Sequence, residues 1–143
     1  MEKHATQSTE ETKALGTALA QKIEPGTLVC LAGDLGAGKT TFTQGFLAGM
    51  GADRPYTSPT FVIMKLYELP IPSSTGVKRI YHADAYRVEE KDFRELGFAQ
   101  WCEDPEGIVL LEWPERIANL LPEKRINIIF KSLSENEREI ILS

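Results

Sequence analysis

An eight-residue run in the first third of the chain constrains its fold more than any other feature. Residues 33–40 read Gly-Asp-Leu-Gly-Ala-Gly-Lys-Thr and match the pattern G-x-x-x-x-G-K-[ST]. The run directly follows the apolar stretch Leu28–Ala32, which is typical of a buried strand, and a helix is expected to begin at Lys39. A strand, a glycine-rich loop and a helix in this order predict a phosphate-binding loop, and with it a nucleoside triphosphate as ligand.

The chemistry expected of this loop depends on its glycines and on its last residues. Gly33, Gly36 and Gly38 carry no Cβ, so successive backbone N–H groups can turn inward around phosphate oxygens. The Lys39 ammonium is expected to reach the β- and γ-phosphates, and the Thr40 hydroxyl to coordinate Mg²⁺. The other residues predicted to contact the nucleotide here are Asp34, Ala37 and Thr41.

The rest of the chain alternates between helix and strand patterns. Helical spacing predicts helices over about 9–22, 39–49 and 89–98. Apolar or β-branched runs predict strands at about 28–32, 61–67, 77–82, 107–112, 125–130 and 139–142, of which the second and third form a hairpin. This order predicts one domain over residues 1–143, a three-layer α/β P-loop NTPase domain whose mixed central sheet is mostly parallel with antiparallel additions. The nucleotide is then expected at the carboxyl ends of the parallel strands.

Length, charge and hydropathy limit the possible functions. The chain of 143 residues is long enough for one core. It has no apolar run of membrane-spanning length and no signal-peptide pattern at its start, so a cytoplasmic protein with no membrane partner is expected. The formal net charge of −5 argues against direct binding of nucleic acid over a broad surface, so any such role is expected to run through a partner protein. Cys30 and Cys102 form no CxxC pair and are expected to be free thiols.

Two carboxylates follow predicted strands and are candidates for metal binding and catalysis. Glu112 ends an apolar run, at the place where a Walker B strand usually carries Asp, and Asp84 follows another predicted strand. In phosphoryl transfer, carboxylates at strand ends hold Mg²⁺ and the attacking water. We therefore predict catalytic roles for Lys39, Asp84 and Glu112, and a metal site formed by Thr40, Asp84 and Glu112. An ordinary solvated carboxylate is the alternative for each acid.

Four other side chains have both a functional and a local interpretation. Thr60 lies where GTPase-like proteins place a switch residue that senses Mg²⁺ and the γ-phosphate, and the alternative is a loop Thr bonded to its own backbone. Trp113 can stack on a base or partner, or serve as a buried anchor. His82 is expected to pack or bond locally rather than ligate a metal, since no second His lies near it in sequence. Arg138 can meet phosphate or base, or pair with a carboxylate.

Several motifs, in order along the chain, resemble those of the TsaE (YjeE) family. They are the helix start S-T-E-E-T with the following L-G, then GDLGAGKTTFTQGF, SPTF, YHADAYR and LLEWPER. The combination of H-x-D-x-Y-R with E-W-P is highly specific, and the match covers almost the whole chain. The resemblance implies a bacterial ATPase that binds ATP/ADP and Mg²⁺ and works with the TsaD and TsaB proteins in making N6-threonylcarbamoyladenosine in tRNA.

The resemblance also implies roles for single residues. In the family, TsaD transfers the threonylcarbamoyl group, whereas ATP hydrolysis at the TsaD–TsaB dimer permits repeated turnover, and tRNA is met only indirectly through the complex. By position, the phosphate loop keeps its roles, Glu112 becomes a Mg²⁺ ligand or water positioner, and Asp84 becomes a second acid on the metal side. Three further residues fall at family positions near the nucleotide: Trp113 and, toward the adenosine end, Thr9 and Arg138.

Three other functions are compatible with a phosphate loop alone. A small-molecule or nucleoside kinase shares the loop, but this chain is short and shows no Arg-rich lid to close over a second substrate. A GTPase is disfavoured because the sequence contains no N-K-x-D segment. A nucleotide-gated binding module stays open as the third alternative. The ATPase hypothesis differs from it by predicting weak hydrolysis that partner proteins stimulate.

Overall fold

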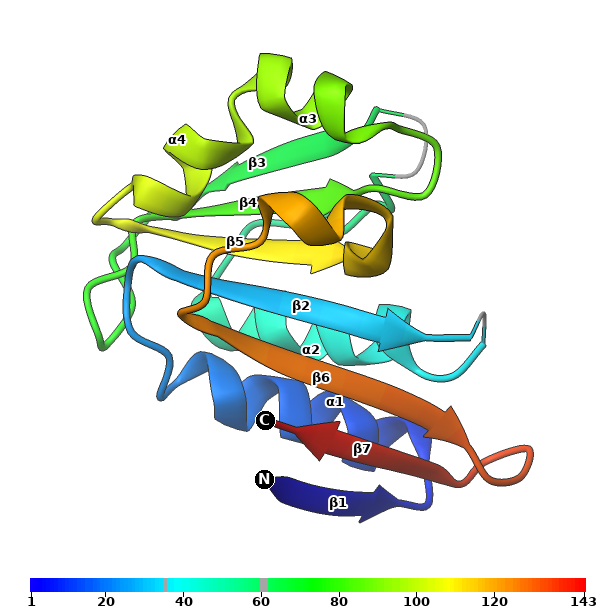
Figure 1. Ribbon diagram of the computed structural model, residues 1–143. Coiled ribbons are helices and arrows are strands. Elements are labelled where there is room, and N and C mark those ends of the chain that lie inside the picture. The colour runs from blue at the N-terminus through cyan, green and yellow to red at the C-terminus, as the bar shows by residue number, and fades with distance from the viewer. Residues whose placement is uncertain (35, 60–61) are drawn as a thin grey trace.

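The structure is a computed structural model that describes residues 1–34, 36–59 and 62–143 (Figure 1). The strands are β1 (Glu2–Thr6), β2 (Thr27–Gly33), β3 (Met64–Glu68), β4 (Arg79–Asp84), β5 (Gly107–Glu112), β6 (Arg125–Ser132) and β7 (Arg138–Leu142). The helices are α1 (Thr9–Ala20), α2 (Lys39–Met50), α3 (Glu90–Leu96), α4 (Phe98–Glu103) and the 3₁₀ helix η1 (Pro114–Leu120). Within the described ranges, no helix is both long enough and apolar enough to span a membrane.

One sheet runs through the centre of the molecule in the order β1-β7-β6-β2-β5-β4-β3. The four strands β6, β2, β5 and β4 pair in parallel. Strand β3 joins β4 as an antiparallel hairpin at one edge, and β7 and β1 are added antiparallel at the other. The predicted fold is therefore confirmed as a mixed sheet with a parallel centre and antiparallel additions. The pairing of β1 with β7 also brings the two termini side by side (Figure 1).

The two central strands are apolar on both faces. Residues 27–31 of β2 and 107–111 of β5 are all buried, and Val29 lies beside Leu110 in the parallel register. Such continuous apolar runs are typical of strands that helices cover on both sides. At the end of β2, Gly33 has φ 139, and a Cβ there would lie 2.5 Å from the Phe130 carbonyl oxygen of β6. A glycine is required for this close approach between strands.

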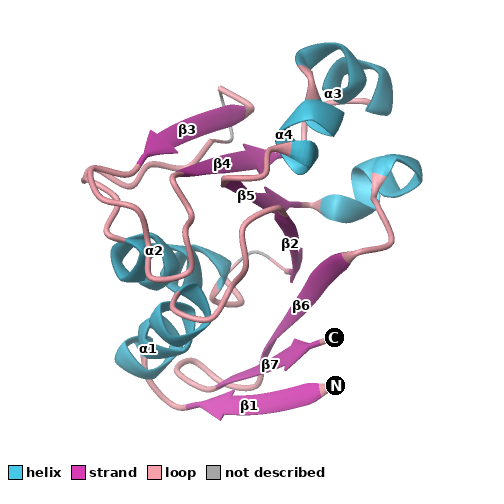
Figure 2. Ribbon diagram, turned by 90° about the vertical axis from the view of Figure 1, so that its left-hand side faces the viewer, coloured by secondary structure: helices cyan, strands magenta, loops and turns pink. Residues whose placement is uncertain are grey.

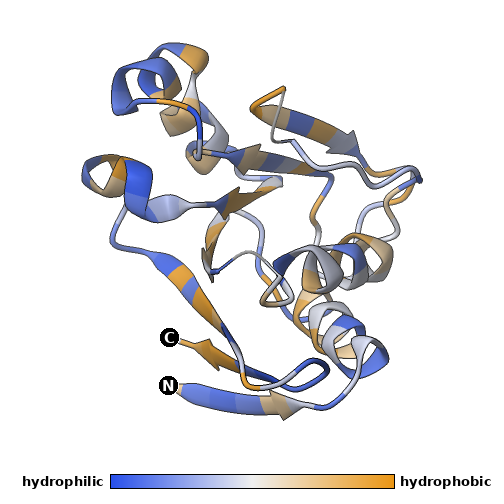
Figure 3. Cartoon of the chain, turned by 90° about the vertical axis from the view of Figure 1, so that its right-hand side faces the viewer, coloured by the Kyte–Doolittle hydropathy of each residue, from blue (hydrophilic) through white to orange (hydrophobic). Residues whose placement is uncertain are grey.

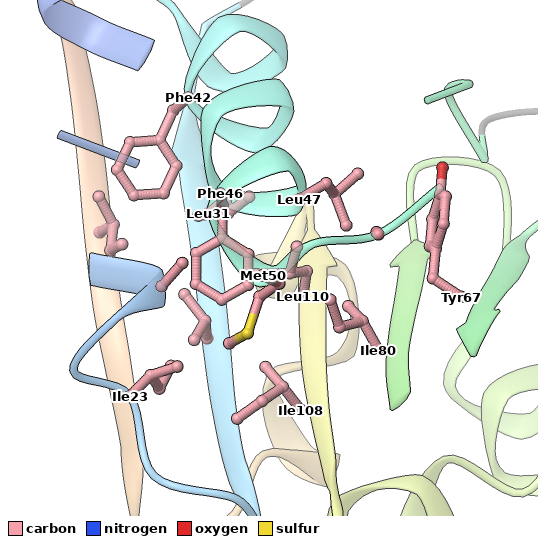
Figure 4. Packing of buried hydrophobic residues seen from close by; sticks show 14 of the residues in the cluster. Ile23, Leu31, Phe42, Phe46, Leu47, Met50, Tyr67, Ile80, Ile108 and Leu110 are labelled. Carbon is pink, nitrogen blue, oxygen red and sulfur yellow. The ribbon is translucent and has the colours of Figure 1, made fainter. Parts of the chain in front are cut away.

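Helices α1 and α2 cover one face of the sheet (Figure 2). They approach each other closely at two glycines. A Cβ on Gly16 would lie 2.2 Å from the Phe42 carbonyl oxygen, and one on Gly45 would lie 2.1 Å from the Lys13 carbonyl oxygen. Between α2 and the sheet lies the larger core cluster, whose members in Figure 4 include Leu31, Phe42, Phe46, Leu47, Met50, Ile108 and Leu110. This packing fixes the start of α2 against the ends of the central strands.

Helices α3, α4 and η1 cover the opposite face and complete the third layer (Figure 2). The sequence predicts one helix over 89–98, but the structure has two. Gly97 has φ 100 and ends α3 before α4 begins, because this left-handed conformation does not continue a helix. The aromatic rings of Phe93, Phe98 and Trp101 pack edge to face or tilted under the two helices.

Strand β1 is an element that the sequence pattern does not predict. Its residues are polar or small, and in Figure 3 it carries mostly hydrophilic colours beside the hydrophobic β7. The pairing runs from Glu2 beside Leu142 to Thr6 beside Arg138. The strand therefore forms because β7 offers it backbone partners, and not because of its own hydropathy.

Candidate nucleotide-binding site

The phosphate loop joins β2 to α2 at the carboxyl ends of the parallel strands. Gly36 has φ 79 and Gly38 has φ 105, both in the left-handed region that favours glycine. Gly38 directly precedes α2, which begins at Lys39 as the sequence predicts. The N-terminal N–H groups and the dipole of α2 therefore point to a place where an anion is favoured.

A cavity of about 250 Å³ lies beside this loop. The predicted site residues that line it are Thr9, Gly36, Gly38, Lys39, Thr40, Thr41, Asp84, Glu112, Trp113 and Arg138. Three predicted contacts, Gly33, Asp34 and Ala37, are not among the lining residues. Gly33 packs against β6 instead, and the Ala37 side chain is buried in the core. The predicted switch residue Thr60 lies outside the described residues.

Five other lining residues are not among the site residues that the sequence predicts. They are Ser8, Thr12, Ser58, Glu135 and Asn136. Ser8 and Thr12 come from the start of α1, and Glu135 and Asn136 from the turn between β6 and β7. The capping pattern at Ser8 is visible in the sequence, and its hydroxyl accepts a hydrogen bond from Glu11 N at 3.1 Å. What the sequence does not reveal is that this helix start lies beside the phosphate loop, where a Cβ on Gly38 would be 3.7 Å from Thr12 Cγ2.

The Lys39 side chain is buried, with 5% of the residue exposed. Its Nζ donates a hydrogen bond to the Gly33 carbonyl oxygen at 2.6 Å. The same ammonium lies 4.1 Å from the centroid of the Trp113 ring, a cation–π contact. The charge that is expected to meet phosphate is thus held by partners within its own chain.

The two predicted acids end neighbouring strands. Asp84 of β4 and Glu112 of β5 are partners in the parallel register, so both reach the same edge of the sheet. Asp84 is 4% exposed, and its Oδ1 accepts a hydrogen bond from Tyr86 N at 2.8 Å. The Glu112 carboxylate lies 2.9 Å from the buried His82 ring through Oε2 and Nε2. His82 therefore bonds within the chain, but to a residue thirty positions away that its sequence neighbourhood does not point to.

This donor set fits a metal that binds together with a nucleotide. Among the described residues, no group of three or more His, Cys, Asp or Glu side chains is placed to hold a metal ion by itself. Thr40, Asp84 and Glu112 nevertheless line one cavity. Mg²⁺ is usually held by one or two carboxylates, with substrate phosphates and waters completing its shell. A hydroxyl and two acids beside a phosphate loop match that chemistry.

Trp113, which lines the cavity, has an unusual backbone conformation. Its φ of 60 lies in the left-handed region, which is rare for a bulky residue. The Tyr86 ring lies 4.9 Å away between centroids, and Lys39 lies over the indole. Such strain of about 1–3 kcal/mol is retained where surrounding structure enforces it, often at ligand sites.

Arg138 connects the far end of the chain to the phosphate loop. Its guanidinium donates a hydrogen bond to the Gly36 carbonyl oxygen at 3.1 Å and another to the Ser134 carbonyl oxygen at 2.7 Å. Thr9, at the first turn of α1, lines the same cavity. The structure therefore brings these two residues, expected from the family pattern, to one side of the site.

The two cysteines are free, as the sequence predicts. Burial raises the pKa of the Cys30 thiol to about 12 and that of the Cys102 thiol to about 11. Both thiols are therefore protonated at neutral pH and are poor nucleophiles.

Comparison with known proteins identifies the family. The family model described as "Threonylcarbamoyl adenosine biosynthesis protein TsaE" matches residues 6–140 of the chain. The chain belongs to the TsaE family. The TsaE protein of Bacillus subtilis (strain 168) is 42% identical over 138 residues, which cover 96% of this chain and 82% of that protein. The TsaE protein of Treponema pallidum (strain Nichols) is 36% identical over 139 residues, which cover 96% of this chain and 97% of the relative.

A solved structure agrees with the TsaE assignment. The crystal structure of Bacillus subtilis YdiB matches with a TM-score of 0.80 at 37% sequence identity, covering 97% of this chain and 82% of that one. The two most specific TsaE motifs also have clear places here. H-x-D-x-Y-R begins in β4 with His82 and Asp84, and E-W-P begins at Glu112, the last residue of β5. The two motifs thus meet across a pair of neighbouring strands.

Proposed function

We propose that this chain binds and hydrolyses ATP with Mg²⁺, as a subunit of the machinery that makes N6-threonylcarbamoyladenosine in tRNA. The observation that carries the proposal is one cavity at the ends of β2, β4 and β5, lined by Lys39, Thr40, Asp84 and Glu112. The relatives are named for tRNA threonylcarbamoyladenosine biosynthesis, which supports the choice of pathway.

Triphosphate binding requires the Lys39 ammonium to change partners. In the structure its hydrogen bond goes to a neutral acceptor, the Gly33 carbonyl oxygen. A phosphate oxygen carries negative charge, and charge-assisted hydrogen bonds are about twice as strong as neutral ones. The ammonium therefore moves to the β- and γ-phosphates, while backbone N–H groups near Gly36 and Gly38 and at the α2 N-terminus donate to the remaining oxygens.

The strand-end acids then complete the site for hydrolysis. Thr40 and Glu112 would hold Mg²⁺, with Asp84 on the same side, and the metal would neutralise charge on the phosphate oxygens. The Glu112 carboxylate ends β5 at the cavity and can accept a hydrogen bond from the attacking water, which orients that water toward the γ-phosphate. Lys39 stabilises the negative charge of the transferring group.

The adenosine end is assigned to the side of the cavity formed by the two ends of the chain. Thr9 lies at the start of α1, and Arg138 already spans from β7 to the phosphate loop. The Trp113 indole offers a flat face at the same cavity. These residues would hold the nucleoside without the N-K-x-D segment that reads guanine.

We further propose that TsaD and TsaB are the protein partners and that tRNA is reached through them in the cytoplasm. The net charge of −5 supports an indirect role, because direct tRNA binding is driven largely by Lys and Arg contacts to phosphate. Hydrolysis is then weak for the isolated chain and stimulated in the complex, where turnover is needed.

Two variants separate hydrolysis from mere nucleotide binding. In a reconstituted system with TsaD, TsaB, tRNA and the threonylcarbamoyl donor, Lys39→Ala and Glu112→Ala are both expected to abolish sustained modification. Glu123 and Lys124 are adjacent in the sequence and exposed, and they provide matched controls. Glu123→Ala and Lys124→Ala should both retain sustained modification. If only Lys39→Ala loses modification, nucleotide binding suffices and the chain is a nucleotide-gated binding module.

A further inference from the structure

His82 lies directly behind the acid that is proposed to orient the attacking water. It belongs to β4, is 3% exposed, and places Nε2 2.9 Å from Glu112 Oε2. It is two residues before Asp84 on the same strand, so their side chains leave the same face. The imidazole thus reaches Glu112 from within the protein and not from the nucleotide cavity.

A second, small cavity of about 30 Å³ is lined by His82. Thr40 and Thr43 of α2 line it together with His82 and Glu112. Two of these lining residues each carry a buried polar atom, Thr43 Oγ1 and His82 Nδ1, that has no hydrogen-bond partner among the described residues. Thr43 is 4% exposed, so bulk water does not satisfy its hydroxyl.

The size and chemistry of this cavity suit one buried water molecule. A water needs a cavity of roughly 10–15 Å³ and two or more polar partners. The cavity exceeds that volume, and Thr43 Oγ1 and His82 Nδ1 are polar groups that require partners. A water between them would satisfy both atoms at once.

We propose that His82 is a positioning residue for Glu112, held in place by a buried water that bridges Thr43 Oγ1 and His82 Nδ1. Because Nδ1 accepts a hydrogen bond from this water, the ring proton is on Nε2 and is donated to Glu112 Oε2. One carboxylate oxygen is thereby fixed, and the other is left for the attacking water or the metal. The inference rests on the proposed function, in which Glu112 orients that water.

Nitrogen NMR of the full chain tests the hydrogen-bond chain without any ATP hydrolysis. The sequence has two histidines, and the more exposed His4 serves as the internal reference. We expect the His82 ring proton on Nε2, and we expect Thr43→Val to shift the Nδ1 resonance more than the Nε2 resonance. A proton on Nδ1, or an Nδ1 resonance that does not respond to Thr43→Val, would overturn the proposal.

Kinetics in the partner complex test the positioning role itself. His82→Gln keeps an amide donor near the Nε2 position, whereas the shorter His82→Asn does not reach Glu112. We expect His82→Asn to lower kcat about 10–100-fold with KM for ATP nearly unchanged, and His82→Gln to recover most of the loss. His4→Asn is the matched control and should leave both constants as they are.

The outcomes separate this proposal from the proposed function. Equal losses in His82→Asn and His82→Gln, or a raised KM with an intact kcat, would overturn the positioning role. Thr43→Val removes a single hydroxyl and serves as the second variant if His82→Asn fails to fold, with a lower kcat expected and an unchanged kcat overturning the proposal. If the wild-type complex does not hydrolyse ATP, the proposed function fails, and the NMR result still decides the His82 arrangement.

Discussion

The Lys39 ammonium has two partners within its own chain, and both sit at the site it is expected to serve. The hydrogen bond to Gly33 and the contact with the Trp113 ring keep the charge buried before a ligand arrives. An unpaired buried ammonium is costly, so these partners stabilise the free protein. They also make Trp113 a direct reporter of where the ammonium lies.

We predict that ATP binding changes the tryptophan emission of the chain, because Lys39 leaves the indole face for the phosphates. Trp101, the second tryptophan, is buried in α4 and does not line the nucleotide cavity, so it should give a constant signal. A fluorescence titration checks this, with Trp113→Phe and Lys39→Ala as variants that remove the response. A full ATP response in Trp113→Phe would contradict the prediction.

Asp104 lies at the centre of a half-buried hydrogen-bond network outside the nucleotide site. It accepts hydrogen bonds from Arg79 at 2.8 Å and from the Tyr81 hydroxyl at 2.7 Å. Burial alone would raise the pKa of the Asp104 carboxyl, but the hydrogen bonds from Tyr81 and Arg79 outweigh it and hold this pKa below its ordinary value. Burial, together with the bond to Asp104, raises the pKa of Tyr81 to about 12.

These shifts predict a pH-dependent loss of stability in Asp104→Asn. A carboxyl whose pKa is lowered in the folded protein contributes stability at pH values above its ordinary pKa of about 3.9. This stabilisation is lost as the pH falls through the pKa of the folded state. Near pH 7 the free energy of unfolding of the variant should be about 1–3 kcal/mol lower than that of the wild type. This difference in stability should become smaller below about pH 4. Urea unfolding at pH 7 and pH 3 checks this. Substitution of the exposed Asp53 by Asn is the control. A stability difference between wild type and Asp104→Asn that stays constant with pH would contradict the prediction.

At the scale of elements, the crossing of α1 and α2 determines where the phosphate loop is held. Gly16 and Gly45 bring the two backbones together so closely that an added methyl group would meet a carbonyl oxygen of the other helix. Backbone atoms cannot turn aside as a side chain can. The α2 helix, with Lys39 and Thr40 at its start, is therefore positioned by backbone packing.

We predict that Gly45→Ala destabilises the protein by about 1–3 kcal/mol or more, since the helices must separate to admit the Cβ. Ala gains in helix propensity over Gly, but by only about 1 kcal/mol. The exposed Ala14→Ser in α1 is the control and should change stability by less than about 0.5 kcal/mol. Equal unfolding midpoints for wild type and Gly45→Ala would show that the crossing is not tight.

The elements that the sequence predicts well are those whose pattern is decided locally. The apolar β2 and β5 and the capped start of α1 lie where expected. β1 was not predicted because its strand partners come from β7, at the other end of the chain. The break at Gly97 depends on one left-handed residue within an otherwise helical pattern.

The same distinction applies to the site. The phosphate loop and the strand-end acids are recognisable because their chemistry follows short motifs. The contact between His82 and Glu112 depends on how β4 and β5 pair, and the lining by Glu135 and Asn136 depends on where the β6–β7 turn projects. Local sequence contains no signal for either, because both arise from the arrangement of the sheet.

At the scale of the whole molecule, three parts of the chain that are distant in sequence line the same cavity. The start of α1 and the turn before β7 face the phosphate loop, and the β1–β7 pairing ties the two ends of the chain together. A nucleotide bound there would contact both ends and the centre at once. Such a site is suited to couple ATP binding and hydrolysis to a partner surface, which is the role proposed in tRNA modification.

The most direct test of that role is ATP turnover measured for the chain alone and then with TsaD, TsaB and tRNA. We predict weak hydrolysis by the isolated chain and a clear stimulation by the TsaD–TsaB pair, absent in Lys39→Ala. Turnover that the partners leave unchanged would contradict the account.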